Sequence, residues 1–288
     1  MTAYPLIGIA TLLAGALFLE AQEPPRDAAL VEKKWEELSN HDLSAEGSKA
    51  LAVEPKKWKH AETDNFVLHF RRLTEARKAA REVEYDIAFI AQTLGAGKER
   101  YSRKSHVFVF EDDKEWENFV MQTDAPPWSV SFAHGDELFL NIRRSETTGR
   151  FNSETLAHET THAVVARLYP RRRWPLWLNE GFAEYMGGAS VAARKNQTLK
   201  RHEQKLTAAD MRLDELFALE QYPKNQADVG RLYQSAERFV RFMMTELPRE
   251  RFPQFIDAVL DGAKVEDAIV KIYGDKFKNF DEFKKKYN

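Results

Sequence analysis

The segment LAHETTHAVV, residues 156–165, constrains this chain most, because it carries two histidines four positions apart. On an α-helix, such residues differ by about 40° around the axis and by about 6 Å along it. His158 and His162 would therefore project side by side, and both imidazoles could reach one metal ion at about 2.0–2.1 Å. Glu159 is rotated by about 100° from His158, so it could face a water on that ion, as a general base must.

The pentapeptide HETTH also occurs by chance on ordinary buried helices, so its surroundings decide how it is interpreted. Apolar residues flank it on both sides, and two histidines and a glutamate on a partly buried helix are costly without partners. Eighteen residues after His162, the segment WLNEGFAEY contains Glu180. This segment lies in a second expected helix, 175–188, and a glycine pair is expected to end that helix. The loop PRRRWP is long enough to turn the chain back. The spacing therefore predicts three protein ligands and one open position, as in catalytic zinc sites.

Composition narrows the classes of protein that fit. The 288 residues carry a formal net charge of −2, which argues against a dedicated nucleic-acid binder. A hydrophobic content of 43 % is enough for a core of one medium domain or two small ones. The chain has no cysteine, which excludes thiolate metal ligands and thiol catalysis. A zinc site would have to be built from histidines and carboxylates.

The amino-terminal residues 1–21 are predicted to be a signal peptide or a retained membrane anchor. Their apolar run, residues 6–19, carries no charge and is shorter than the roughly 20 residues of a spanning helix. In either case the rest of the chain is expected to be exported, periplasmic or extracellular, with membrane contact only through that anchor. Residues 22–57 are interpreted as a linker or a peripheral helical segment.

Further along the chain, alternating apolar residues predict strands, and apolar residues at helical spacing predict helices. The strands are expected at 63–70, at 105–110 and as a hairpin within 126–142, and the helices at 74–94 and 152–169. Residues 191–288 show amphipathic helical patterns and no strand signal. The order predicts an α+β fold: a catalytic domain at 58–190 with a small mixed sheet and an active-site helix, and a helical subdomain at 191–288 that completes the cleft.

HETTH followed by WLNEGFAEY resembles the gluzincin metallopeptidases, the group that includes thermolysin and the zinc aminopeptidases. With TDNFVLHF and LYQSAERFVRFM, the chain is most similar to bacterial peptidase MA-like domains over residues 58–247. The resemblance implies a zincin-like fold and a Zn²⁺-dependent peptidase that acts on peptide or protein substrates. It implies that His158, His162 and Glu180 bind zinc and that Glu159 is the general base.

The resemblance also implies roles for two further residues. Glu184 lies four residues after Glu180 and would hydrogen-bond a ligand histidine, although a solvated glutamate is the alternative. Tyr233 would stabilise an oxyanion, and the alternative is an aromatic residue of the core. His134 and His202 are weaker candidates for oxyanion support, because a histidine without a partner is more typical of a surface or a strand.

The segment DELFLNI, residues 136–142, could form the sheet edge along which an extended peptide lies. Zinc aminopeptidases have a Gly-x-Met-Glu-Asn segment here, and this chain has AHGDELFLN instead, which argues against exopeptidase activity. Asp136 or Glu137 could nevertheless approach a substrate amine. The alternative to an enzyme is a non-catalytic, zinc-containing module that binds peptides or cell-envelope components.

Overall fold

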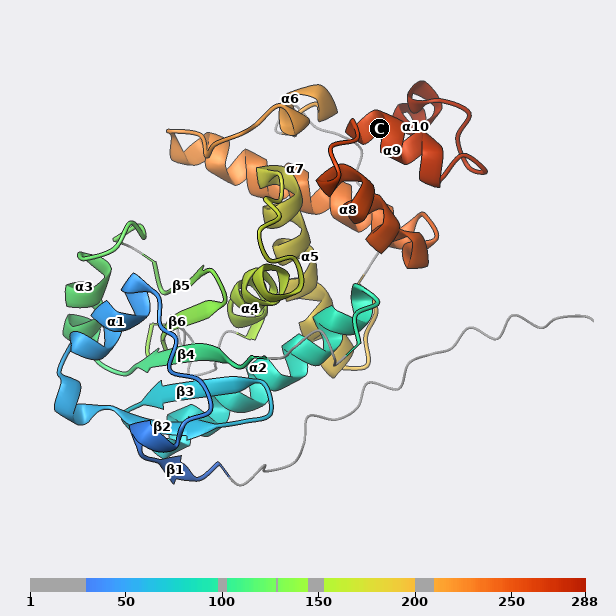
Figure 1. Ribbon diagram of the computed structural model, residues 1–288. Helices are drawn as coiled ribbons and strands as arrows, with labels where there is room; N and C mark the ends of the chain where they lie inside the picture. Colours follow the sequence, from blue (N-terminus) through green and yellow to red (C-terminus); the bar gives the residue numbers. More distant parts are fainter. Residues whose placement is uncertain (1–29, 98–102, 128, 145–152, 200–209) are drawn as a thin grey trace, which may run out of the picture.

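The computed structural model describes residues 30–97, 103–127, 129–144, 153–199 and 210–288. These residues form an α+β fold in which a six-stranded mixed sheet is followed by a mostly helical C-terminal part (Figure 1). The predicted signal or anchor and His202 lie outside the described residues. None of the described helices combines the length and the apolar character that a membrane crossing requires.

The sheet has the strand order β1-β2-β3-β4-β6-β5, in which β3, β4 and β6 are parallel and the outer pairs are antiparallel. Its strands are β1 (Glu32–Lys33), β2 (Lys59–Glu62), β3 (Phe66–Phe70), β4 (Ser105–Phe110), β5 (Ser131–His134) and β6 (Glu137–Asn141). The strands expected at 63–70, at 105–110 and within 126–142 are confirmed.

The expectation that DELFLNI forms the sheet edge was wrong. This segment contains β6, which pairs with β4 on one side and with β5 on the other. All five residues of β6 are buried, as is typical of an interior strand. The hairpin turn at Gly135-Asp136 folds β5 to the outside, so β5 is the edge.

Two layers of helices cover the two faces of the sheet, because successive side chains of a strand point to opposite sides. On β4, Val107 and Val109 join the main core, which α2 (Leu73–Thr93) and α4 (Ser153–Leu168) cover. Phe108 and Phe110 join a second, aromatic cluster on the other face, which α1 (Ala45–Ala52) and α3 (Asp113–Val120) cover. Short 3-10 helices lie at η1 (Trp35–Glu37) and η2 (Pro55–Lys57). Residues 30–57, interpreted as a linker or peripheral segment, thus add an edge strand and part of a covering layer.

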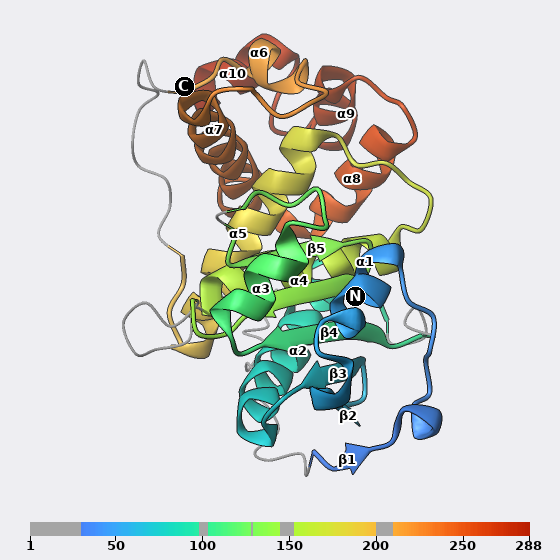
Figure 2. The same ribbon diagram turned by 90° about the vertical axis from the view of Figure 1, so that its left-hand side faces the viewer.

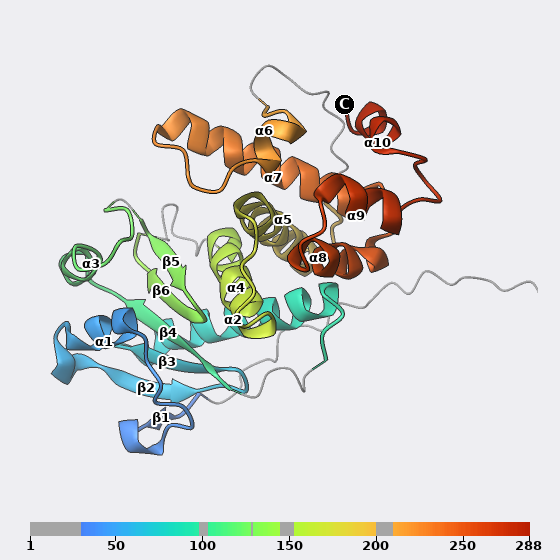
Figure 3. The same cartoon turned by 45° about the horizontal axis from the view of Figure 1, so that its top comes forward.

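The C-terminal part is built around helix α5 (Leu176–Arg194), which packs between α4 and α7 (Gln226–Thr245) (Figure 3). Helix α4 therefore lies between the sheet and the helical part, which Figure 2 shows above the sheet. The remaining elements are α6 (Leu213–Phe217), η4 (Arg249–Arg251), α8 (Phe252–Leu260), α9 (Val265–Ile272) and α10 (Phe280–Tyr287). Within residues 210–288 the structure contains no strand, as the helical patterns indicated.

The expectation that a glycine pair ends the second helix was wrong, because α5 continues through Gly187 and Gly188 to Arg194. The glycines of α5 allow close helix packing instead. A Cβ atom at Gly187 would lie 2.9 Å from the carbonyl oxygen of Glu154 on α4. A Cβ atom at Gly181 would lie 2.4 Å from the carbonyl oxygen of Ala236 on α7. Tertiary contacts therefore override the local tendency of glycine to end a helix.

This packing predicts opposite effects for two glycine-to-alanine substitutions in α5. Gly181→Ala forces α5 and α7 apart, and we expect it to lower the free energy of unfolding by about 3 kcal/mol or more. At Gly188 the nearest atom to an added Cβ is 3.5 Å away, so Gly188→Ala should be neutral or stabilise by up to about 1 kcal/mol. Urea unfolding measures both variants, and equal effects would contradict the packing argument.

A row of three histidines crosses the sheet on the face that carries the second core. His60 Nδ1 on β2 lies 2.8 Å from His69 Nδ1 on β3, and His69 Nε2 lies 2.9 Å from His106 Nδ1 on β4. Burial lowers the pKa of His69 well below its ordinary value and lowers the pKa of His106 to about 4. All three are therefore neutral at pH 7, and His69 and His106 are fully enclosed.

The buried histidines predict acid-induced destabilisation. Because the folded-state pKa of His106 is about 4 and the unfolded value is 6.5, only the unfolded chain takes up this proton between these pH values. The free energy of unfolding should fall as pH drops through that window, by up to about 1.4 kcal/mol per pH unit for each such histidine. In His106→Gln we expect the slope to be shallower by about 1 kcal/mol per pH unit. The exposed His134→Gln serves as control, and an unchanged slope in His106→Gln would contradict the assignment.

Candidate metal centre

Helix α4 places its two histidines side by side, as the four-residue spacing predicts. His158 Nε2 and His162 Nε2 lie 3.1 Å apart, and both side chains are mostly buried. Helix α5 runs beside α4 and brings Glu180 to the same point. Glu180 Oε2 lies 3.6 Å from each of the two Nε2 atoms. The structure thus brings together the three residues that the sequence predicts as ligands.

The three atoms fit one metal ion. A triangle with sides of 3.1, 3.6 and 3.6 Å has its corners about 2.0 Å from its centre, and Zn–N and Zn–O bonds are about 2.0–2.2 Å long. Glu180 is 1 % exposed, and its Oε2 is buried without a hydrogen-bond partner. A buried carboxylate oxygen with no donor needs a cation, so the donor set fits zinc by both geometry and charge.

The electrostatics of the site couple Glu180 to His162. Burial alone would lower the pKa of His162, but the Glu180 carboxylate outweighs burial and raises that pKa above its ordinary value. Burial alone would raise the pKa of Glu180, but His162 outweighs it and lowers that pKa. Both directions show that the centre favours a positive charge beside Glu180.

Glu159 also lies near the two imidazoles, with a carboxylate oxygen within 4.8 Å of the histidine nitrogens. Its Oε1 accepts a hydrogen bond of 3.3 Å from the Ser131 hydroxyl on edge strand β5. Glu180 is the better third ligand, because its free oxygen is closer and has no other partner. Glu159 is hydrogen-bonded to Ser131, so it is left as the carboxylate beside the three candidate ligands.

The structure places the two further candidates at the same site. Glu184 Oε1 lies 3.3 Å from His158 Nδ1, the ring nitrogen that faces away from Glu180. The ring of Tyr233, on α7, has its centroid 6.2 Å from that of His158. A pocket of about 420 Å³ opens here, and it is lined by Glu154, Thr155, His158, Glu159, Glu184, Gly187 and Tyr233.

Three side chains of this site were missed by sequence reasoning. Tyr222, in the loop between α6 and α7, donates a hydrogen bond of 2.7 Å to Glu180 Oε1, and Asn179 Nδ2 donates to the same oxygen at 3.3 Å. Ser131 is the third. Tyr222 and Ser131 are far from HETTH in the sequence and follow no helical spacing, so no local pattern marks them. Asn179 directly precedes Glu180, and only that adjacency could have indicated it.

The residues expected at the hairpin turn are engaged elsewhere. His134 Nε2 lies 3.2 Å from Glu46, and Asp136 accepts a hydrogen bond of 2.8 Å from Arg103. Glu137 accepts a hydrogen bond of 2.8 Å from the backbone N–H of Ser44 at the start of α1. These contacts tie the hairpin to neighbouring segments, so none of the three residues is oriented toward the candidate ligands.

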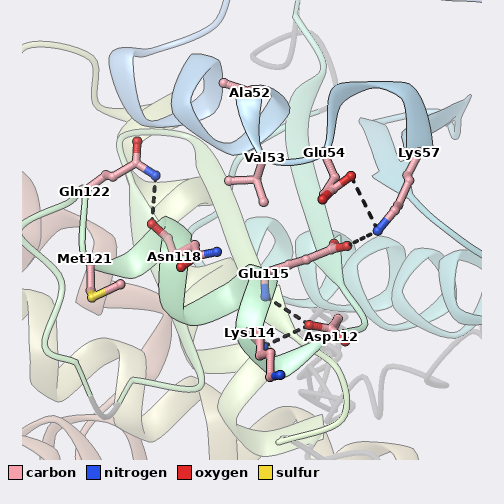
Figure 4. Close-up of a pocket in the computed structure, with 10 residues that line it drawn as sticks. All are labelled: Ala52, Val53, Glu54, Lys57, Asp112, Lys114, Glu115, Asn118, Met121 and Gln122. Carbon is pink, nitrogen blue, oxygen red and sulfur yellow. Dashed lines mark hydrogen bonds and ion pairs between the residues drawn. The ribbon is translucent and has the colours of Figure 1, made fainter.

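A larger hollow of about 690 Å³ lies between the α1–η2 segment and α3, on the other face of the sheet (Figure 4). Its charged side chains bind one another. Lys57 donates a hydrogen bond of 2.9 Å to Glu115, and Asp112 caps the start of α3. No histidine lines this hollow, and it offers no set of converging metal ligands comparable to that on α4 and α5.

Comparisons of this chain with protein-family models, with curated proteins and with solved structures found no match. The roles assigned to the site residues therefore depend on the geometry of the site itself.

The ligand set predicts the effect of removing one carboxylate. Glu180→Gln keeps the shape of the side chain but removes its charge, and we expect zinc affinity to fall by at least about 100-fold. Loss of an outer hydrogen-bond partner alone costs about 10–100-fold, and loss of a ligand should cost more. Competition with a chromophoric chelator measures the affinity, with the exposed Glu250→Gln as control. Equal affinity in Glu180→Gln and the parent protein would remove Glu180 from the ligand set.

Proposed function

We propose that this protein is a zinc-dependent peptidase with a zincin-like catalytic domain, in which His158, His162 and Glu180 hold the metal. One observation carries the proposal: three donor atoms from two helices converge at the spacing of zinc ligands, and the carboxylate oxygen among them has no other partner. When bound, zinc supplies Lewis acidity, which lowers the pKa of water to about 7 and polarises a carbonyl group.

Glu159 is the general base in this proposal. It follows His158 on α4, and its carboxylate faces the same pocket without taking part in the ligand triangle. The Ser131 hydroxyl holds Oε1 and leaves Oε2 available to accept a proton from the attacking water. The same carboxyl group would then deliver the proton to the leaving amine of the cleaved peptide.

Glu184 and Tyr233 have two different supporting roles in the proposed reaction. Glu184, at 3.3 Å, is placed to accept a hydrogen bond from the Nδ1–H group of His158, which would fix the ring with Nε2 toward the metal. Tyr233 lines the pocket, and burial raises the pKa of its phenol, so the phenol stays protonated at neutral pH. It could donate a hydrogen bond to the negative charge that develops on the carbonyl oxygen.

The edge strand β5 supports a peptide as the substrate. The backbone N–H of Asn141 donates to the carbonyl of Val130, so by antiparallel alternation Ser131 and Ala133 turn their backbone groups away from β6. An extended peptide could pair with these groups as an added strand. Since the Ser131 side chain contacts Glu159, such a peptide would pass beside the general base. Export through residues 1–21 remains a prediction.

The proposal predicts that Glu159→Gln separates metal binding from turnover. The variant should bind zinc with unchanged stoichiometry, because Glu159 is not a ligand. Its kcat should fall by at least about 100-fold, because general bases contribute about 10²–10⁴-fold. The assay is digestion of a diverse peptide library by the zinc-loaded protein lacking residues 1–21, followed by mass spectrometry, with Glu250→Gln as control.

Two results would argue against the proposal. Unimpaired cleavage by Glu159→Gln would remove Glu159 from the mechanism. A parent protein that binds zinc stoichiometrically and cleaves no peptide of the library would favour a zinc-containing binding module instead.

A further inference from the structure

Tyr222 lies in an unusual position for a side chain that reaches the metal centre. It belongs to the loop between α6 and α7, and the residue is 52 % exposed. Its hydroxyl nevertheless points inward and donates a hydrogen bond of 2.7 Å to Oε1 of Glu180, which is 1 % exposed. The hydrogen bond thus joins the loop to a candidate ligand.

The two oxygens of Glu180 have different partners. Oε1 accepts hydrogen bonds from Tyr222 at 2.7 Å and from Asn179 at 3.3 Å. Oε2 accepts none and lies 3.6 Å from both imidazole nitrogens. The hydrogen bond from a phenol to a carboxylate is charge-assisted and therefore stronger than a neutral one. Of the two donors, Tyr222 is the closer, so it contributes more to holding the carboxyl group in one orientation.

We propose that Tyr222 is a positioning residue that fixes Glu180 as a single-oxygen metal ligand and couples metal binding to the order of the α6–α7 loop. The inference rests on the proposed zinc site. Without the phenol, the carboxyl group could rotate, and Oε2 would no longer be held toward His158 and His162. Each metal-binding event would then have to order the side chain, which weakens binding.

Tyr222 and Tyr233 have different tasks in this proposal. Tyr222 comes from a loop and donates a hydrogen bond to Glu180, whereas Tyr233 comes from helix α7 and lines the pocket, with its phenol near both Tyr222 and Glu180. Loss of the Tyr222 hydroxyl should therefore act on metal binding.

The test uses Tyr222→Phe, which keeps the ring and removes only the hydroxyl. We expect zinc affinity, measured by competition with a chromophoric chelator, to fall by about 10–100-fold. The visible absorption of the cobalt-substituted protein should also change, because the coordinating oxygen is no longer fixed. The loop variant Gln221→Ala should keep zinc affinity within about threefold of the parent protein. Near-ultraviolet circular dichroism of the metal-free proteins verifies that all variants keep the fold.

Hydrogen exchange tests the coupling to the loop. Zinc should slow amide exchange in residues 218–225 of the parent protein and should slow it less in Tyr222→Phe at saturating zinc. Parent-like zinc affinity, cobalt spectrum and exchange in Tyr222→Phe would overturn the inference and leave the zinc site standing. A parent protein that binds no zinc would overturn the proposed function and, with it, this inference.

Discussion

The candidate site depends on one buried carboxylate that faces two imidazoles. Glu180 is enclosed between helices, and one of its oxygens has no hydrogen-bond donor, so its negative charge must be balanced by a proton on a histidine or by a cation. This balance of charge requires that the distances between helices α4, α5 and α7 stay as they are. Gly181, next to Glu180, permits the close approach of α5 to α7, and Gly187 permits that of α5 to α4. Neighbouring residues of α5 therefore set both the packing of the helices and the position of the candidate ligand Glu180.

Local patterns predicted most of the fold, and the errors arose where distant contacts decide. Strand β4 and helix α4 follow from periodicity, because each buries one or both faces against a core. The strand order does not follow from periodicity. Contacts between residues distant in the sequence determine which strand of the hairpin pairs with β4. The sequence therefore suggested β6 as the edge, whereas β5 occupies it. The length of α5 was underestimated for a similar reason, since Gly187 permits close packing against α4 and neither Gly187 nor Gly188 ends the helix.

The same division applies to the site. The relation of His158 to His162 is fixed by helix geometry, so it could be predicted from the five residues HETTH alone. The approach of Glu180 required only that a second helix fold back on the first. Tyr222 and Ser131 could not be predicted, because one lies in a loop and the other on an edge strand, and only the tertiary fold brings them to the two glutamates. Side chains that orient a reactive group from another element leave no periodic signal in the sequence.

Helix α4 separates two layers that act on the site in different ways. From the helical side, α5 and the α6–α7 loop hold Glu180 and so determine how the metal would be bound. From the sheet side, the edge strand β5 contacts Glu159 through Ser131. Changes in the helical layer should therefore act first on metal affinity, whereas changes in β5 should act first on substrate binding and proton transfer. Because the two layers reach the site through different residues, Tyr222 on Glu180 and Ser131 on Glu159, the two properties could be altered separately in this fold.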